Sequence, residues 1–222
     1  MIGLPVSKSL RRRLPFACAL VFVCAIRALA QEPIGTLVRP GATVSLLKAW
    51  PEIAKAPKEK LATLEFLVRP DSAAIARPRS FIMTLSNQAG RDAAVLSVTL
   101  ENGTVHGYVF GTALRAPRPL KPGRWTHVAL TVNTKTINKQ ATLWIDGKRV
   151  SEELVLEHWP QSFEVAELLS DKWNLGRVFS GSIGDVRISN VVRYRKDFNP
   201  PSSLPRDDFC SFHLAGTRIP IQ

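Results

Sequence analysis

Between residues 61 and 189 the dominant pattern is an alternation of apolar and polar positions with a period of two. This period is typical of strands that bury one side and expose the other. Val, Leu, Thr and aromatic residues, which favour strands, are concentrated in a series of short segments. The pattern therefore predicts strands at residues 61–69, 81–85, 94–100, 104–110, 125–132, 141–145 and 182–189.

Two dipeptides between these segments have the composition of tight turns. Asn102-Gly103 and Asp146-Gly147 tolerate positive φ at both central positions of a type I′ turn, so each predicts a hairpin between its flanking strands. The prolines of segment 117–123 predict a rigid loop that leads into the strand at 125–132.

Helix is scarce in this pattern. The composition of residues 45–60 predicts one short helix that ends before Pro57. Residues 164–169 have the composition of one or two helical turns. No repeat, low-complexity tract or Pro/Gly/Ser linker divides the chain, which indicates one domain at residues 31–222. Many short strands without βαβ alternation favour an all-β fold, a two-sheet antiparallel sandwich.

Residues 1–30 have the organisation of a helical, cleavable signal peptide. Basic residues cluster at positions 8–13, an apolar run follows at 14–26, and small residues precede a cleavage site between Ala30 and Gln31. The alternative is an uncleaved membrane anchor, which Arg27 beside the cleavage site keeps open. The apolar run has about 13 residues where a bilayer needs roughly 20, so we expect cleavage, no stable membrane insertion, and a secreted, periplasmic or extracellular protein.

Loss of residues 1–30 changes the meaning of the composition. The whole chain has 30 Lys and Arg against 18 Asp and Glu, and removal of five bases leaves 25 against 18, a net charge of +7. The remaining bases are scattered and no nucleic-acid-binding motif is present, so no nucleic-acid partner is expected. Cys210 becomes the single thiol, which excludes an intramolecular disulfide.

Five motifs in order resemble laminin-G-like jellyroll domains of the concanavalin A-like lectin/glucanase superfamily, of the bacterial secreted type. The motifs are 64–70 (LEFLVRP), 123–129 (GRWTHVA), 141–148 (ATLWIDGK), 181–189 (GSIGDVRIS), and 192–194 (VRY) with 197–201 (DFNPP). The resemblance covers roughly residues 60–201. It implies an antiparallel jellyroll sandwich.

Strand alternation suggests which side chains lie on the surface. In segment 125–132 the aliphatic positions share one side and His127 lies on the other, and in segment 141–145 Trp144 lies opposite Leu143. In this superfamily the surface that carries such residues is often a concave face or its rim, where an indole can stack on a sugar ring. We therefore consider Trp144 and His127 candidate ligand-binding residues. The alternative is that a loop such as 152–172 covers Trp144.

Trp159 is a third candidate ligand-binding residue. It lies in the least regular segment, beside Pro160, where a binding loop can expose an aromatic side chain. The alternative is that Trp159 caps one end of the sandwich.

Motifs for catalysis and metal binding are missing from the sequence. Glycosidases on this fold place two or three carboxylates on alternating positions of one strand, and no Glu-x-Asp-x-x-Glu pattern occurs. No nucleophile elbow, phosphate loop or dinucleotide fingerprint occurs either. The histidines lack metal-ligand spacing, and calcium needs six to eight oxygen ligands that the aspartates do not assemble in sequence. We expect no enzyme activity and no cofactor. Calcium binding stays open as an alternative, although no ligand set for it is identifiable in the sequence.

The sequence thus predicts a non-catalytic exported binding module. The first hypothesis is recognition of carbohydrate or glycoconjugate, and the alternative is a protein-interaction, adhesion or envelope structural module whose partner is an extracellular or envelope protein. The third hypothesis is a divergent enzyme that acts on glycans.

Overall fold

The structure is a computed structural model of the chain. It describes residues 36–38, 44–45, 47, 50–55, 61–86, 94–133, 139–155, 162–163, 165–168 and 179–215, all within the compact unit Gln31–Gln222. The predicted signal peptide, its cleavage site between Ala30 and Gln31, and Trp159 lie outside these residues. In the part that is described, no helix has the length and apolar character needed to span a membrane.

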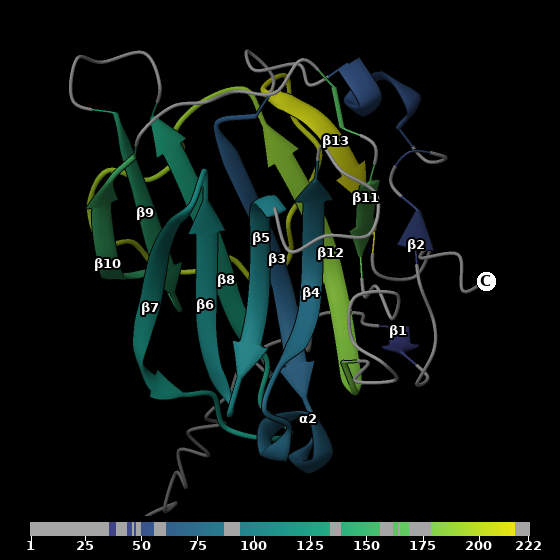
Figure 1. The fold of residues 1–222 in the computed structure, drawn as a ribbon, viewed down its shortest axis with the longest axis vertical. Helices are drawn as coiled ribbons and strands as arrows, with labels where there is room; N and C mark the ends of the chain where they lie inside the picture. Colours follow the sequence, from purple (N-terminus) through teal and green to yellow (C-terminus); the bar gives the residue numbers. More distant parts are fainter. Residues whose placement is uncertain are drawn as a thin grey trace, which may run out of the picture. The chain divides into compact units, whose positions relative to one another are not determined.

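The fold is a sandwich of two antiparallel sheets (Figure 1). In the seven-stranded sheet, strand β13 and strand β1 pair with different parts of β12 along the same edge. The order across this sheet is β1 (Thr36–Val38), β12 (Gly181–Ser189), β3 (Thr63–Pro70), β8 (Thr126–Asn133), β9 (Gln140–Ile145) and β10 (Lys148–Leu154), with β13 (Cys210–Leu214) on β12.

The six-stranded sheet forms the second layer. Its order is β2 (Val44–Ser45), β11 (Val165–Leu168), β4 (Ser80–Ser86), β5 (Ala94–Glu101), β6 (Thr104–Val109) and β7 (Thr112–Pro119). Strands β7 and β10 are therefore the sheet edges on one side of the sandwich, and they contact each other there.

The all-β prediction is confirmed, and each of the predicted strand segments coincides with a strand. Both predicted hairpins are present. Asn102 and Gly103 have φ of 47° and 77°, and Asp146 and Gly147 have φ of 47° and 72°, as type I′ turns require.

The local predictions between the main strands were less accurate. A short 3-10 helix, η1 (Pro51–Lys55), ends before Pro57 as expected, and helix α2 (Ser72–Ala76) was not predicted. The prediction of a helical turn at 164–169 was wrong, because strand β11 lies there and pairs with both β2 and β4. Pairing on both sides outweighs the weak helical preference of so short a segment. The prolines at 117 and 119 lie in β7, where an edge strand tolerates missing donors.

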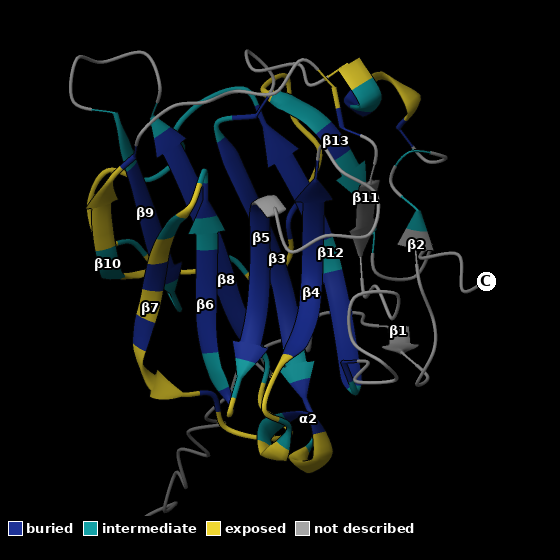
Figure 2. Ribbon diagram, viewed as in Figure 1, coloured by how far each residue is buried: buried dark blue, intermediate teal, exposed yellow. Residues whose placement is uncertain are grey.

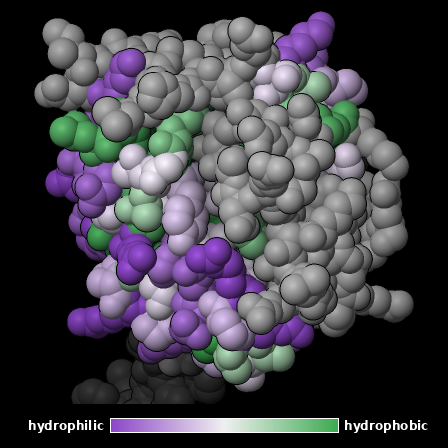
Figure 3. Space-filling view, viewed as in Figure 1, coloured by the Kyte–Doolittle hydropathy of each residue, from purple (hydrophilic) through white to green (hydrophobic). Residues whose placement is uncertain are grey.

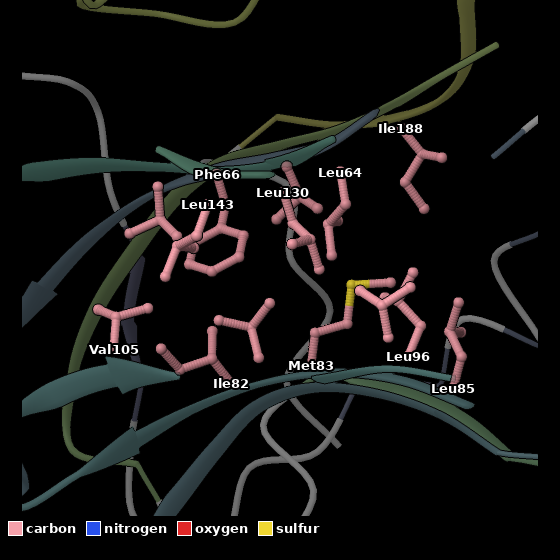
Figure 4. Packing of buried hydrophobic residues seen from close by; sticks show 14 of the residues in the cluster. Leu64, Phe66, Ile82, Met83, Leu85, Leu96, Val105, Leu130, Leu143 and Ile188 are labelled. Carbon is pink, nitrogen blue, oxygen red and sulfur yellow. The ribbon is translucent and has the colours of Figure 1, made fainter. Parts of the chain in front are cut away.

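The core lies between the sheets, where aliphatic side chains from both layers interdigitate (Figure 4). The central strands are buried, whereas β7 has several exposed positions and β10 has only exposed and half-buried ones (Figure 2). Residues that face one another across the core include Leu64, Phe66, Leu130, Leu143 and Ile188 of one sheet and Ile82, Met83, Leu85, Leu96 and Val105 of the other.

Candidate functional site

The outer side of the seven-stranded sheet carries a buried polar cluster centred on Glu65 of β3. The carboxylate is fully buried. Its Oε1 accepts a hydrogen bond of 2.8 Å from Arg187 Nε of β12, and its Oε2 accepts one of 2.6 Å from the Tyr194 hydroxyl. His127 Nε2 of β8 lies 3.1 Å from the same Oε2. One carboxylate thus links two neighbouring strands to the segment that follows β12.

The ionisation of this cluster follows from its contacts. Burial by itself raises the pKa of a carboxyl, but hydrogen bonds from His127, Arg187 and Tyr194 together with the Arg187 charge hold the pKa of Glu65 below its ordinary value. Burial and the neighbouring carboxylate raise the pKa of Tyr194, so its hydroxyl remains a donor at neutral pH. Glu65 is therefore a charged structural anchor.

Two aromatic rings cover this polar cluster. Tyr194 and Phe198 stack with ring centroids 3.7 Å apart, and both present edges to the His127 ring at 5.9 and 5.6 Å. The Trp144 indole packs against the same pair at 6.2 and 5.9 Å and donates from Nε1 to the Thr131 hydroxyl at 3.2 Å. The segment after β12 therefore closes this surface.

The predicted ligand-binding residues can now be placed. Trp144 and His127 come together on the predicted side of the sheet, but they are only 1% and 2% exposed. Contact with a ligand requires the rings of Tyr194 and Phe198 to move away, so for these two residues ligand binding stays a prediction. The cover over Trp144 comes from these rings, whereas the sequence suggested segment 152–172. Trp159 lies outside the described residues, and its role also stays a prediction.

Further contacts hold the covering segment in place. Arg193 makes two hydrogen bonds to the Asp207 carboxylate, at 2.8 and 2.7 Å. Asp185 Oδ2 of β12 accepts a hydrogen bond from the Leu204 backbone amide at 2.8 Å. Among the described residues, no group of three or more His, Cys, Asp or Glu side chains is arranged to hold a metal ion.

A cleft of ≈ 250 Å³ opens beside β7, where the edges of the two sheets meet. Its lining combines aliphatic side chains with charged ones. The aliphatic part includes the partly buried Ile145 of β9 and Val150 of β10 together with Leu120, and the charged part is Arg118, Lys121, Arg124 and Asp146. Hydrophilic surface gathers over the lower end of β7 in the view of Figure 3.

The Asp146 carboxylate organises one wall of the cleft. Its Oδ2 accepts from Arg124 Nη2 at 3.0 Å, and its Oδ1 accepts from the backbone amide of His127 at 3.0 Å. The backbone amide of Asp146 in turn donates to the His127 carbonyl at 2.8 Å. The turn residue that was predicted for its backbone conformation therefore also positions a cation at the cleft.

Sequence reasoning did not identify this cleft. The segment 117–123 was interpreted as a rigid proline loop, although a base occupies two of its seven positions and Arg124 follows it directly. A base that recurs between prolines is a local signal for a presented positive charge, because proline fixes the backbone that carries it. The distance in sequence between this segment and Ile145 or Val150 concealed the apolar part of the site.

Comparison with known proteins places the fold. Among curated proteins, none matches the chain. A candidate carbohydrate-binding protein from Bacteroides ovatus shares 15% identity over 82% of this chain and 50% of its own, with a TM-score of 0.55. This chain thus spans half the length of that protein.

Two further solved structures come from sialidases. The CBM40 of the Ruminococcus gnavus IT-sialidase, bound to α2,3-sialyllactose, shares 16% identity over 74% of this chain and 94% of its own, with a TM-score of 0.57. The leech intramolecular trans-sialidase shares 16% identity over 73% of this chain and 26% of its own, with a TM-score of 0.55. At these identities the likeness concerns the fold alone.

A laminin-G family model matches residues 48–197, most of the chain. The match covers all five motifs on which the resemblance was based except the last few residues of the final one, and the sandwich supplies the expected architecture. The chain belongs to the concanavalin A-like lectin/glucanases superfamily.

Proposed function

We propose that the chain is a non-catalytic binding module that recognises carbohydrate through the cleft beside β7, and that it acts outside the cytoplasm after export. The observation that carries this proposal is the composition of the cleft. Aliphatic side chains from Leu120, Ile145 and Val150 lie next to charged hydrogen-bonding groups. Sugars present both C–H faces and hydroxyl edges, and such a lining complements both.

The closed outer side of the seven-stranded sheet supports the choice of this site. Trp144 and His127 are sealed beneath Tyr194 and Phe198, whereas the cleft is open to solvent and carries an exposed Arg124. The solved CBM40 that shares this fold holds a sialylated sugar, which favours a glycan ligand over other small molecules. Export is supported by the organisation of residues 1–30.

The carboxylate content of the cleft argues against hydrolysis. Glycoside hydrolysis uses two carboxyl groups that flank the scissile bond. Asp146 is the single carboxylate among the described residues that line the cleft, and both of its oxygens already accept hydrogen bonds. Glu65 is buried under the Tyr194 and Phe198 rings and cannot supply the second group.

A glycan array probed with the chain tests the proposal. The matched variants are Val150→Phe, which fills the cleft, and Val192→Phe, which changes another half-buried valine outside the cleft. We expect the wild type and Val192→Phe to retain the same glycans and Val150→Phe to lose them, with equal melting midpoints. Retention of glycans by Val150→Phe would move the site away from the cleft. An array without any hit, together with stable self-association or capture of an envelope protein, would favour the protein-interaction module.

A further inference from the structure

We infer that the ligand of the cleft is an acidic carbohydrate, whose carboxylate or sulfate oxygens are bound by Arg118 and Lys121. This inference rests on the proposed function, because it names the class of sugar that the same cleft selects. It starts from the charges in the cleft, where three bases accompany one carboxylate and leave a net charge of +2.

The cations of the cleft differ in whether a partner already neutralises them. Arg124 is matched by Asp146 at 3.0 Å. Arg118 and Lys121 are both exposed and form no ion pair with another residue of the described part of the chain. Elsewhere on the surface some bases are already neutralised, as in Lys148 with Asp197 at 3.1 Å. The cleft therefore presents two positive charges that an incoming anion can neutralise.

The backbone that carries these cations is held in place before any ligand arrives. Pro117 and Pro119 fix φ on either side of Arg118. Leu120 is buried, and its amide donates to the Gly103 carbonyl at 2.8 Å. At the end of the segment, the Gly123 amide donates to the Pro70 carbonyl at 2.8 Å. Because little main-chain order is lost on binding, charge-assisted hydrogen bonds from these side chains contribute more fully to affinity.

The edge of β7 favours a sugar over an acidic peptide. A peptide that adds to a sheet edge needs a row of backbone donors and acceptors. Pro117 and Pro119 lie in β7 and have no backbone N–H, which interrupts that row. A saccharide needs no such ladder, because its C–H face can lie on the aliphatic lining while its anionic group meets Arg118 and Lys121.

The experiment compares two double variants of the full chain with the same change of charge. Arg118→Gln with Lys121→Gln removes the free cations of the cleft. Arg195→Gln with Lys196→Gln removes an exposed Arg and Lys outside it, so this variant is the matched control. The probes are oligogalacturonate, its methyl-esterified neutral form, dextran sulfate, unsubstituted dextran and poly-glutamate. Binding is measured by isothermal titration at low and high salt, and melting midpoints check that both variants fold.

We expect oligogalacturonate or dextran sulfate to bind more tightly than the matching neutral chain, and the two acidic probes to distinguish a carboxylate from a sulfate site. The cleft variant should lose about tenfold or more of this affinity and most of its salt dependence, while the control variant stays within about twofold. Equal binding of acidic and neutral chains, or equal losses in the two variants, would overturn the inference and leave the proposed function standing. Equal binding of poly-glutamate would assign the cleft to acidic protein. Binding of no saccharide on the array or by titration would remove the proposed function as well.

Discussion

Replacement of Glu65 by Gln should destabilise the protein strongly, although the two side chains have the same shape. The buried carboxylate accepts from Arg187 Nε at 2.8 Å and from the Tyr194 hydroxyl at 2.6 Å. The neutral amide leaves the Arg187 charge, whose side chain is 7% exposed, without its main counter-ion. Removal of one partner from a buried ion pair costs about 3–5 kcal/mol. For a domain of this size, such a loss lowers the melting midpoint by roughly 6–20 °C.

Urea unfolding of the wild type and Glu65→Gln, followed by tryptophan fluorescence, measures this difference. The control is Glu152→Gln, which makes the same chemical change in a solvent-accessible ion pair with Arg149. An exposed ion pair contributes about 0–1 kcal/mol, so the control should change little. A loss below about 1 kcal/mol for Glu65→Gln, at an unchanged slope with denaturant, would refute the role of Glu65 as the anchor of the covering segment.

Further predictions concern the same surface and the turn beside it. Gly147→Ala should cost about 1–3 kcal/mol in urea unfolding, because the added methyl overlaps the Phe198 carbonyl; Gly111→Ala, at a similar φ of 81° but in open space, measures the backbone strain alone. Trp144→Ala should cost about 3–5 kcal/mol by the same assay, because the indole is buried. Because the folded-state pKa of Glu65 is lowered, its contribution to stability is present above the ordinary value of 4.5 and is lost as pH falls through the lower folded value. A urea series against pH should therefore show a shallower acid limb for Glu65→Gln than for the wild type, and parallel limbs would contradict this assignment.

The strands could be predicted because each one carries its own signal. Alternation located β3, β8 and β12, and Asp146-Gly147 located a hairpin, because side-chain period and positive φ are local properties. Strand β11 could not be predicted in this way. Its four residues form a strand because β2 and β4 lie on either side, and those partners are distant in sequence. The prolines of β7 were compatible with a strand only at a sheet edge, which the sequence alone does not specify.

The sequence predicted only part of the candidate site. The period of two correctly placed Trp144 and His127 on the side of the sheet opposite the core. It carried no information on whether another segment covers that side, because burial by Tyr194 and Phe198 depends on how residues after β12 fold back. The cleft depends on the same kind of long-range contact, since Arg118 and Val150 come from the edges of different sheets.

The β9–β10 turn connects the closed surface with the open cleft. On one side, the Gly147 carbonyl accepts from the Phe198 amide at 2.9 Å, so the turn holds the segment that seals Trp144. On the other side, the adjacent Asp146 holds Arg124 at the cleft. Asp146 and Gly147 are consecutive in the chain, and one contacts the cleft cation while the other contacts the covering segment. The docked covering segment therefore also fixes the position of the cleft wall. The turn thereby links the buried aromatic surface to the proposed binding cleft, and this docked geometry leaves little main-chain order to be lost on binding.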